Sequence, residues 1–231
     1  MRLLWLLVAT LPLVPLALTA YSDMPPPAHT GGFGEPTCAE CHDDNPINAD
    51  GGVLQLNGIP QSYTPGRSYA IRILLRRDGL QRAGFQLASR FSKGPATGQQ
   101  AGTWTVDGEL IQTTTDHEVV YVEQTKKGNL VKPLGAVEWQ MTWQAPAAPQ
   151  GAVAFHVAGN ASNRDDSPLG DFIYVTSQTS EPAAPNVAAH SSSATGCPSV
   201  PDAFCMRYVR IRPSRSPSST RFTSPISTFV R

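Results

Sequence analysis

The sequence lacks the patterns of the commonest enzyme folds. It has no internal repeat, no helical hydrophobic period of any length, and no alternation of strands with helices. No glycine-rich phosphate-binding loop follows a predicted strand, and no nucleophile stands in a recognisable arrangement with a base. We therefore expect a protein that is not an enzyme.

Charge is balanced over the whole chain, with 18 Lys and Arg against 18 Asp and Glu, but it is unevenly distributed. All 18 acidic residues lie between Tyr21 and Met206. Arg2 precedes this stretch and six Arg follow from Arg207 onward, which leaves 11 basic residues and a net charge of −7 within it. An acidic domain argues against nucleic acid as a partner, because phosphate binding depends on Lys and Arg.

Cysteine is scarce, and two of the four cysteines share one motif. Residues 38–42 read Cys-Ala-Glu-Cys-His, the C-x-x-C-H pattern at which a c-type haem is attached. Two thiols at this spacing add to the two vinyl groups of one porphyrin, and the following histidine supplies the proximal nitrogen to the iron. The sequence thus predicts a covalent haem c on Cys38 and Cys41, with His42 as the proximal iron ligand.

The neighbouring residues favour a short helix at the motif. Thr37 and Glu40 match the S/T-x-x-E capping box, which predicts a helix that starts at Cys38. The two cysteines and the histidine then stand at positions i, i+3 and i+4 and share one face. Asn45-Pro46 ends the helix.

Two other interpretations of Cys38 and Cys41 remain open. A redox disulfide is one, although that motif normally follows a strand of an α/β fold, and no such pattern surrounds it here. A zinc site is the other, but it needs a second ligand pair, and only Cys197 and Cys205 are left. The alternative function is an extracellular adhesive or structural module with a Cys38–Cys41 disulfide and no haem.

The N-terminus has the form of a secretory signal peptide over residues 1–20. Arg2 is basic, an uncharged apolar run follows, and Ala20 is small. Pro12 and Pro15 interrupt the run, so we expect no membrane span in the mature chain. An uncleaved anchor is the alternative, because the residue at the −3 position is not small. Since bacteria attach haem c outside the cytoplasm, we expect a periplasmic, cell-surface or secreted protein.

Three segments follow the signal peptide. Residues 21–51 form a Pro- and Gly-rich linker with the haem segment. Residues 52–181 show short alternating runs between turn residues, which indicates an all-β, antiparallel, immunoglobulin-like sandwich of seven to eight strands. Residues 182–231, rich in Pro, Ser and Arg, predict a disordered tail. This tail is either genuine and basic or an out-of-frame reading of a GC-rich gene.

Alternation within the clearest strands assigns the core. We expect Trp139, Trp143, Phe155 and Val157 to pack between the two sheets. Residues 119–122 are apolar at every position, which predicts a strand buried on both faces. We expect the haem segment to dock on the outside of this sandwich.

Several stretches resemble one family. Gly31–His42 resembles the Gly-rich opening of bacterial Reeler-like proteins, also called reelin-domain or choice-of-anchor proteins. Trp139–Pro146 (WQMTWQAP) and Gly151–Asp171 (GAVAFHVAGNASNRDDSPLGD), with the Phe-Ile-Tyr that follows, resemble later motifs of the same family. The resemblance spans Gly31–Thr179 and implies a sandwich related to the reelin N-terminal domain. The family often has a histidine where this chain has Gln124.

The sequence alone does not identify the sixth ligand of the iron. His117, beside Asp116, and His156, on a sheet face, are the leading candidates for a distal ligand. His29 lies in the linker, close enough in sequence to fold over the haem, whereas Met141 between two tryptophans is expected to be core. A distal Met raises the potential relative to two His ligands, and an open position admits small ligands. The expected partner is a redox protein that the sequence does not identify.

One acidic loop also carries oxygen side chains suited to calcium. They are Asn160, Asn163, Asp165, Asp166 and Asp171. No EF-hand spacing is present, and Asn and Asp commonly cap turns, so turn capping is the expected role.

Overall fold

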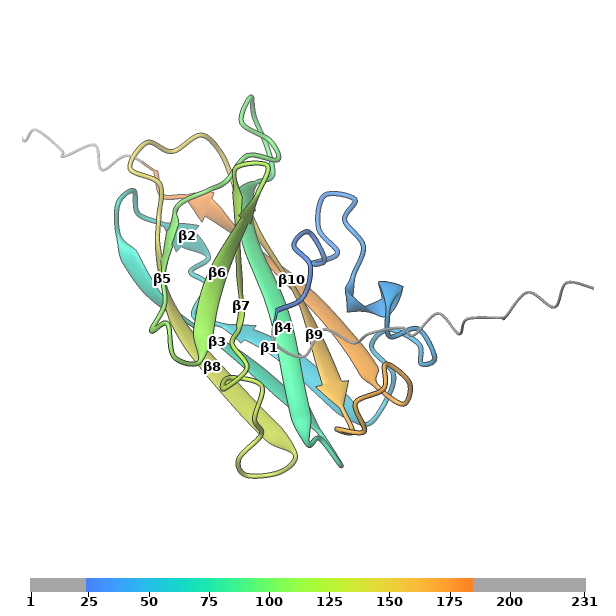
Figure 1. Ribbon diagram of the computed structural model, residues 1–231. Helices are drawn as coiled ribbons and strands as arrows, with labels where there is room; N and C mark the ends of the chain where they lie inside the picture. Colours follow the sequence, from blue (N-terminus) through green and yellow to red (C-terminus); the bar gives the residue numbers. More distant parts are fainter. Residues whose placement is uncertain (1–23, 185–231) are drawn as a thin grey trace, which may run out of the picture. The chain divides into compact units, whose positions relative to one another are not determined.

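The computed structural model describes residues 24–184, which contain one short 3-10 helix and ten strands (Figure 1). The helix η1 spans Cys38–Glu40, and the strands are β1 (Gly52–Asn57), β2 (Ser62–Tyr63), β3 (Ser68–Arg77), β4 (Arg82–Phe91), β5 (Thr103–Thr105), β6 (Ile111–Asp116), β7 (Val119–Gln124), β8 (Ala136–Gln144), β9 (Val153–Ser162) and β10 (Phe172–Pro182). The predicted signal peptide (residues 1–20) lies outside the described residues, as does the predicted tail (residues 182–231) except for its first three residues, of which Pro182 is the last residue of β10. Within residues 24–184, no helix is long and apolar enough to cross a membrane.

The strands form two sheets, which confirms the predicted all-β sandwich. The four-stranded sheet has the order β1-β3-β8-β5, and the six-stranded sheet has the order β2-β10-β9-β4-β7-β6. Neighbouring strands are antiparallel, except that β2 pairs with β10 in parallel over two residues. The ten strands exceed the seven to eight predicted. Strands β2 and β5 are too short to show alternation, and β6 holds a single aliphatic side chain, Ile111.

Alternating side chains explain why these segments form strands. In β3, Ile71, Ile73 and Leu75 are fully buried, whereas Arg72 and Arg76, on the opposite face, are exposed. A period of two places one apolar set on one face of a strand, and that face must pack against a second sheet. This face of β3 therefore packs into the sandwich core.

The core lies between the two sheets and is centred on aromatic rings. Trp139, Trp143, Phe155 and Val157 are all buried there, as predicted. The rings of Trp143 and Phe155 lie 4.8 Å apart in an edge-to-face arrangement, and the indole N–H of Trp143 donates to the Ala101 carbonyl at 3.0 Å. Such aromatic pairs add to the energy of apolar burial, and the satisfied indole removes the penalty of a buried polar group.

The segment before β1 covers the outer face of the six-stranded sheet (Figure 1). Beneath it lie the buried apolar side chains of Ala88, Tyr121 and Ile173, which point away from the sandwich core. Strand β7 is therefore buried on both faces, as predicted, with Val122 toward the core and Tyr121 beneath the N-terminal segment. The segment that carries the cysteine motif thus lies outside the sandwich but is packed against it.

Candidate functional site

The cysteine motif forms a single tight turn. Thr37 caps η1, because its Oγ1 accepts a hydrogen bond from the backbone N–H of Ala39 at 3.1 Å. The His42 N–H then donates to the Cys38 carbonyl at 3.1 Å, which closes the turn. Glu40 does not complete the predicted capping box, since its Oε2 lies 2.6 Å from Nε2 of His29 instead. The helix starts at Cys38 as predicted but extends over three residues only.

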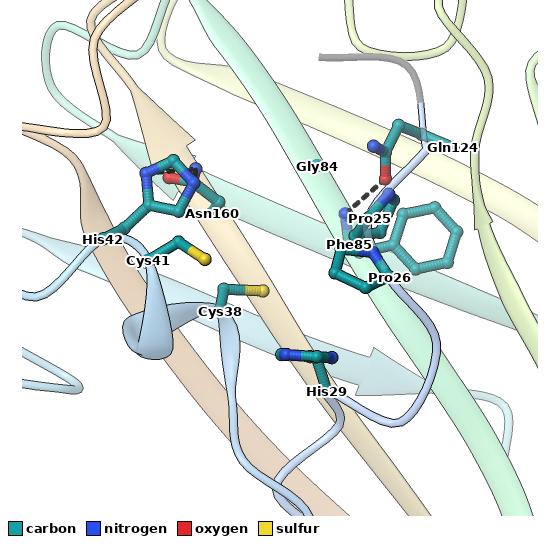
Figure 2. A pocket seen from close by; sticks show the side chains of 10 residues that line it. All are labelled: Pro25, Pro26, His29, Cys38, Cys41, His42, Gly84, Phe85, Gln124 and Asn160. Atoms are coloured by element: carbon teal, nitrogen blue, oxygen red, sulfur yellow. Dashed lines mark hydrogen bonds between the residues drawn. The ribbon is translucent and has the colours of Figure 1, made fainter. Parts of the chain in front are cut away.

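The three residues of the motif converge on one pocket at the outer face of the six-stranded sheet (Figure 2). The pocket has a volume of about 60 Å³. It is lined by Pro25, Pro26, His29, Cys38, Cys41, His42, Gly84, Phe85, Gln124 and Asn160. A second hollow of about 260 Å³ adjoins it and shares His42 and Asn160. The spacing of the motif therefore places both thiols and the imidazole together, as predicted.

The two thiols are not joined to each other. Cys38 and Cys41 are both unpaired in the structure, and Cys41 is exposed. Burial of its thiol raises the pKa of Cys38 to about 12, so this group is protonated at neutral pH. The reactive thiols of redox C-x-x-C motifs have lowered pKa values instead.

His42 is held by a buried carboxylate. Its Nδ1 lies 2.9 Å from Oδ2 of Asp171, which is 1% exposed, and the same oxygen accepts a hydrogen bond from Nδ2 of Asn160 at 3.0 Å. A carboxylate on Nδ1 fixes the tautomer that leaves Nε2 as the base, the usual arrangement of metal-ligating histidines. Asp171 thus orients the predicted iron ligand, a role that the sequence did not reveal.

These residues fit a covalently held haem. The donor set comprises two unpaired thiols at C-x-x-C spacing and an imidazole with a fixed tautomer. Asn160 adds a buried Oδ1 without a hydrogen-bond partner, which points to a missing polar neighbour. The pocket is far smaller than the about 300–1,000 Å³ of sites that enclose drug-sized ligands. The pocket therefore does not enclose a haem, and the fit rests on the donor set alone.

The other predicted iron ligands lie apart from this pocket, with one exception. His117 is in the turn between β6 and β7, and its side chain is 94% exposed. His156 packs its ring edge-on against Phe33 at 5.6 Å, and burial lowers its pKa. Met141 is 3% exposed in the core, as expected. His29 lines the pocket itself.

A second polar cluster fastens the N-terminal segment to the sheet. Oε1 of Glu35 is paired with Arg90 and accepts a hydrogen bond from the Tyr121 hydroxyl at 2.6 Å. Oε2 of the same carboxylate accepts from the Thr30 hydroxyl at 2.5 Å. Burial, together with the bond to Glu35, raises the pKa of Tyr121. This cluster could not be predicted from the sequence, because its members are distributed over three separate segments.

The acidic loop between β9 and β10 is closed by its own side chains. The backbone N–H of Asp165 donates to Oδ1 of Asn163, and that of Ser167 donates to Oδ1 of Asp165. These are the turn-capping bonds expected of Asn and Asp. Within residues 24–184, no group of three or more His, Cys, Asp or Glu side chains is placed to hold a metal ion.

No protein-family model matches the sequence, and no curated protein matches it. Among solved structures, the chain is similar to the human F-spondin reeler domain, with a TM-score of 0.40 and 21% identity over 59% of this chain and 91% of that one. It is similar to the Reelin-N domain of F-spondin, with a TM-score of 0.39 and 22% identity over 59% and 89% of the two chains. A cohesin module of a Clostridium perfringens family 33 glycoside hydrolase gives a TM-score of 0.38 and 6% identity over 56% and 95%.

Proposed function

We propose that this protein is an exported, single-haem c-type protein that acts in one-electron transfer or haem-linked sensing. The observation that carries the proposal is the convergence of Cys38, Cys41 and His42 on one pocket, with Nδ1 of His42 held by buried Asp171. A haem bound there supplies an iron that gains or loses one electron. The electron is exchanged with a redox partner protein, and no other chemistry is assigned to the chain.

Each residue of the motif has a separate role in this proposal. Cys38 and Cys41 hold the porphyrin through thioether bonds, and His42 binds the iron. Asp171 keeps the proton of His42 on Nδ1, which raises the basicity of the ligating nitrogen. The acidic balance of residues 21–206 and the predicted signal peptide support a protein that works outside the cytoplasm without nucleic acid.

Haem staining of denatured protein tests this proposal. The chain is expressed with haem-maturation machinery as wild type, as the single variants Cys38→Ala and Cys41→Ala, and as the double variant. We expect a stained band in the wild type, weak or no stain in the single variants, and none in the double variant, because each thioether requires one thiol. The matched control replaces the other two cysteines, Cys197 and Cys205, with alanine and is expected to keep the stain.

Two outcomes would overturn the proposal. One is a stained band that survives in the Cys38→Ala/Cys41→Ala double variant. The other is a Cys197→Ala/Cys205→Ala protein that carries no pigment and has lost two hydrogens in its intact mass, because Cys38 and Cys41 are then the only thiols left to form a disulfide. His42→Ala provides an internal check, because this variant is expected to retain the attached porphyrin while its iron ligation changes.

A further inference from the structure

His29 shares the pocket with the proximal ligand. Among the described residues, His29 and His42 are the two histidines that line it, together with both cysteines (Figure 2). The other polar side chains of the lining, Gln124 and Asn160, end in amides, which are not usual axial ligands of haem iron. The fifth histidine of the chain, His190, lies outside the described residues.

The backbone of His29 is tied to the sheet rather than left as a free linker. Its N–H donates to Oε1 of Gln86 at 2.7 Å, and Nε2 of Gln86 donates to the Pro26 carbonyl at 3.0 Å. Gln86 is fully buried on β4. A side chain placed by such bonds to a rigid strand keeps its position, as a ligand must.

The ring of His29 is oriented in the same way as that of His42. Its Nδ1 lies 2.8 Å from the Pro27 carbonyl, which can only accept, so this nitrogen carries a proton. Nε2 also faces an acceptor, and it must give up its bond to Glu40 before it can bind iron. Nε2 is directed at the cysteine turn, where it lies 2.6 Å from Oε2 of Glu40. The Glu40 side chain is 58% exposed, so it can turn into solvent without a buried charge being left behind.

The leading sequence candidates are held elsewhere on the sheet. On β9, His156 pairs with Ala88 of β4, whereas Asn160, which lines the pocket, pairs with Gly84 of β4. Four residues along a strand separate His156 from Asn160, a distance of about 13 Å. His117 lies in an exposed turn whose neighbouring hollow shares no residue with the pocket.

We propose that His29, through Nε2, is the second axial ligand of the haem iron. This inference rests on the proposed function and adds the residue that sets its chemistry. Two histidine ligands give a lower reduction potential than a His–Met pair and leave no open position for small ligands. The protein is then an electron carrier and not a sensor of diatomic gases.

Spectroscopy of the haem-loaded protein tests this assignment. The wild type is expected to be low-spin in both oxidation states and not to bind carbon monoxide when reduced. His29→Ala is expected to become high-spin in the ferric state, to bind carbon monoxide in the ferrous state, and to return to low spin on addition of imidazole. The matched controls, His117→Ala and His156→Ala, are expected to keep the wild-type spectrum.

A second variant distinguishes the loss of an iron ligand from a loss of folding. His29→Met supplies a different ligand at the same place, so it is expected to remain six-coordinate with a raised reduction potential. A low-spin, carbon-monoxide-resistant His29→Ala protein would overturn the assignment, as would a change to high spin in His117→Ala or His156→Ala. These results leave the covalent haem intact. Absence of covalent haem in the wild type overturns the proposed function and this inference together.

Discussion

Replacing Trp143 with alanine is expected to lower the free energy of unfolding by about 3–5 kcal/mol. The side chain is fully buried, and its ring lies 5.9 Å from those of both Tyr63 and Tyr69 and 4.8 Å from that of Phe155. Its loss leaves a cavity between two rigid sheets and removes the donor to the Ala101 carbonyl. Because small domains are stable by about 5–15 kcal/mol in total, such a loss takes the protein close to unfolding.

Denaturant melts of the wild type, Trp143→Ala and Gln140→Ala measure this effect. Gln140 is the matched control, since it stands on the same strand but is exposed. Its replacement is expected to change stability by less than about 0.5 kcal/mol. A loss below about 1 kcal/mol in Trp143→Ala would show that the two sheets are not rigid and close around the vacated volume.

The same melts rank the core against the haem segment. A variant deleted through Asp50 is expected to lose less stability than Trp143→Ala. The N-terminal segment buries some apolar surface, but it also covers Gln86 and Glu123, which are both fully buried and which water can solvate once the segment is gone. A deletion more harmful than the Trp143 change would mean that the segment is an integral part of the core.

Glu123→Gln is expected to stabilise the protein by about 3 kcal/mol above pH 7 and to have little effect below about pH 4.5. Burial raises the pKa of Glu123 to about 7, and the hydrogen bonds from Gln86 and Gln112 at 3.4 and 3.5 Å are long and offset it only in part. In the unfolded chain the carboxyl titrates near its ordinary value of 4.5. Between these two values the folded protein binds more protons than the unfolded one, so its stability falls as pH rises.

Urea melts of the wild type and Glu123→Gln at several pH values between about 4 and 8 measure the difference directly. The exposed Glu138 on β8 supplies the control, and Glu138→Gln is expected to follow the wild type at every pH. A difference in stability between the wild type and Glu123→Gln that stays constant across this pH range would contradict the prediction, because a pH-independent difference reports packing and not ionisation.

Sequence alternation predicted the sandwich because period-two burial is a local property of each strand. Ile71, Trp143 and Phe155 could each be assigned to the core from their own neighbours in the chain. The strands that escaped prediction lack this local signal: β5 has three residues, and β6 follows Ile111 with polar side chains. These segments form strands because they pair at an edge of a sheet, and not because they have an apolar pattern. Whether a segment lies at an edge depends on the other strands of the sheet.

The candidate site likewise has one part that could be predicted from the sequence and one part that could not. The thiols and His42 come from one five-residue motif, so their convergence could be predicted from spacing alone. Asp171 and Gln86 could not, because each meets the motif segment through tertiary packing of strands far away in the sequence. Their residue types gave no help either, since Asp171 belongs to a loop that also suits turn capping, and a single glutamine in a strand carries no signal. His29 was recognised as close to the motif, but its fixed orientation appears only in the structure.

The bonds that fasten the cysteine turn have a consequence for the order of events during biogenesis. Asn45 and His42 bond to partners 126 residues later in the chain, at Asp171 and Pro168, so the turn cannot dock onto the sheet before this part of the chain has been made. Until then both thiols stay accessible to an attaching enzyme. Once docking is complete, the Cys38 thiol is partly buried and its raised pKa keeps it protonated, whereas Cys41 stays exposed. Haem attachment and folding are thus expected to compete in time, and a chain that folds first is expected to remain permanently without its pigment.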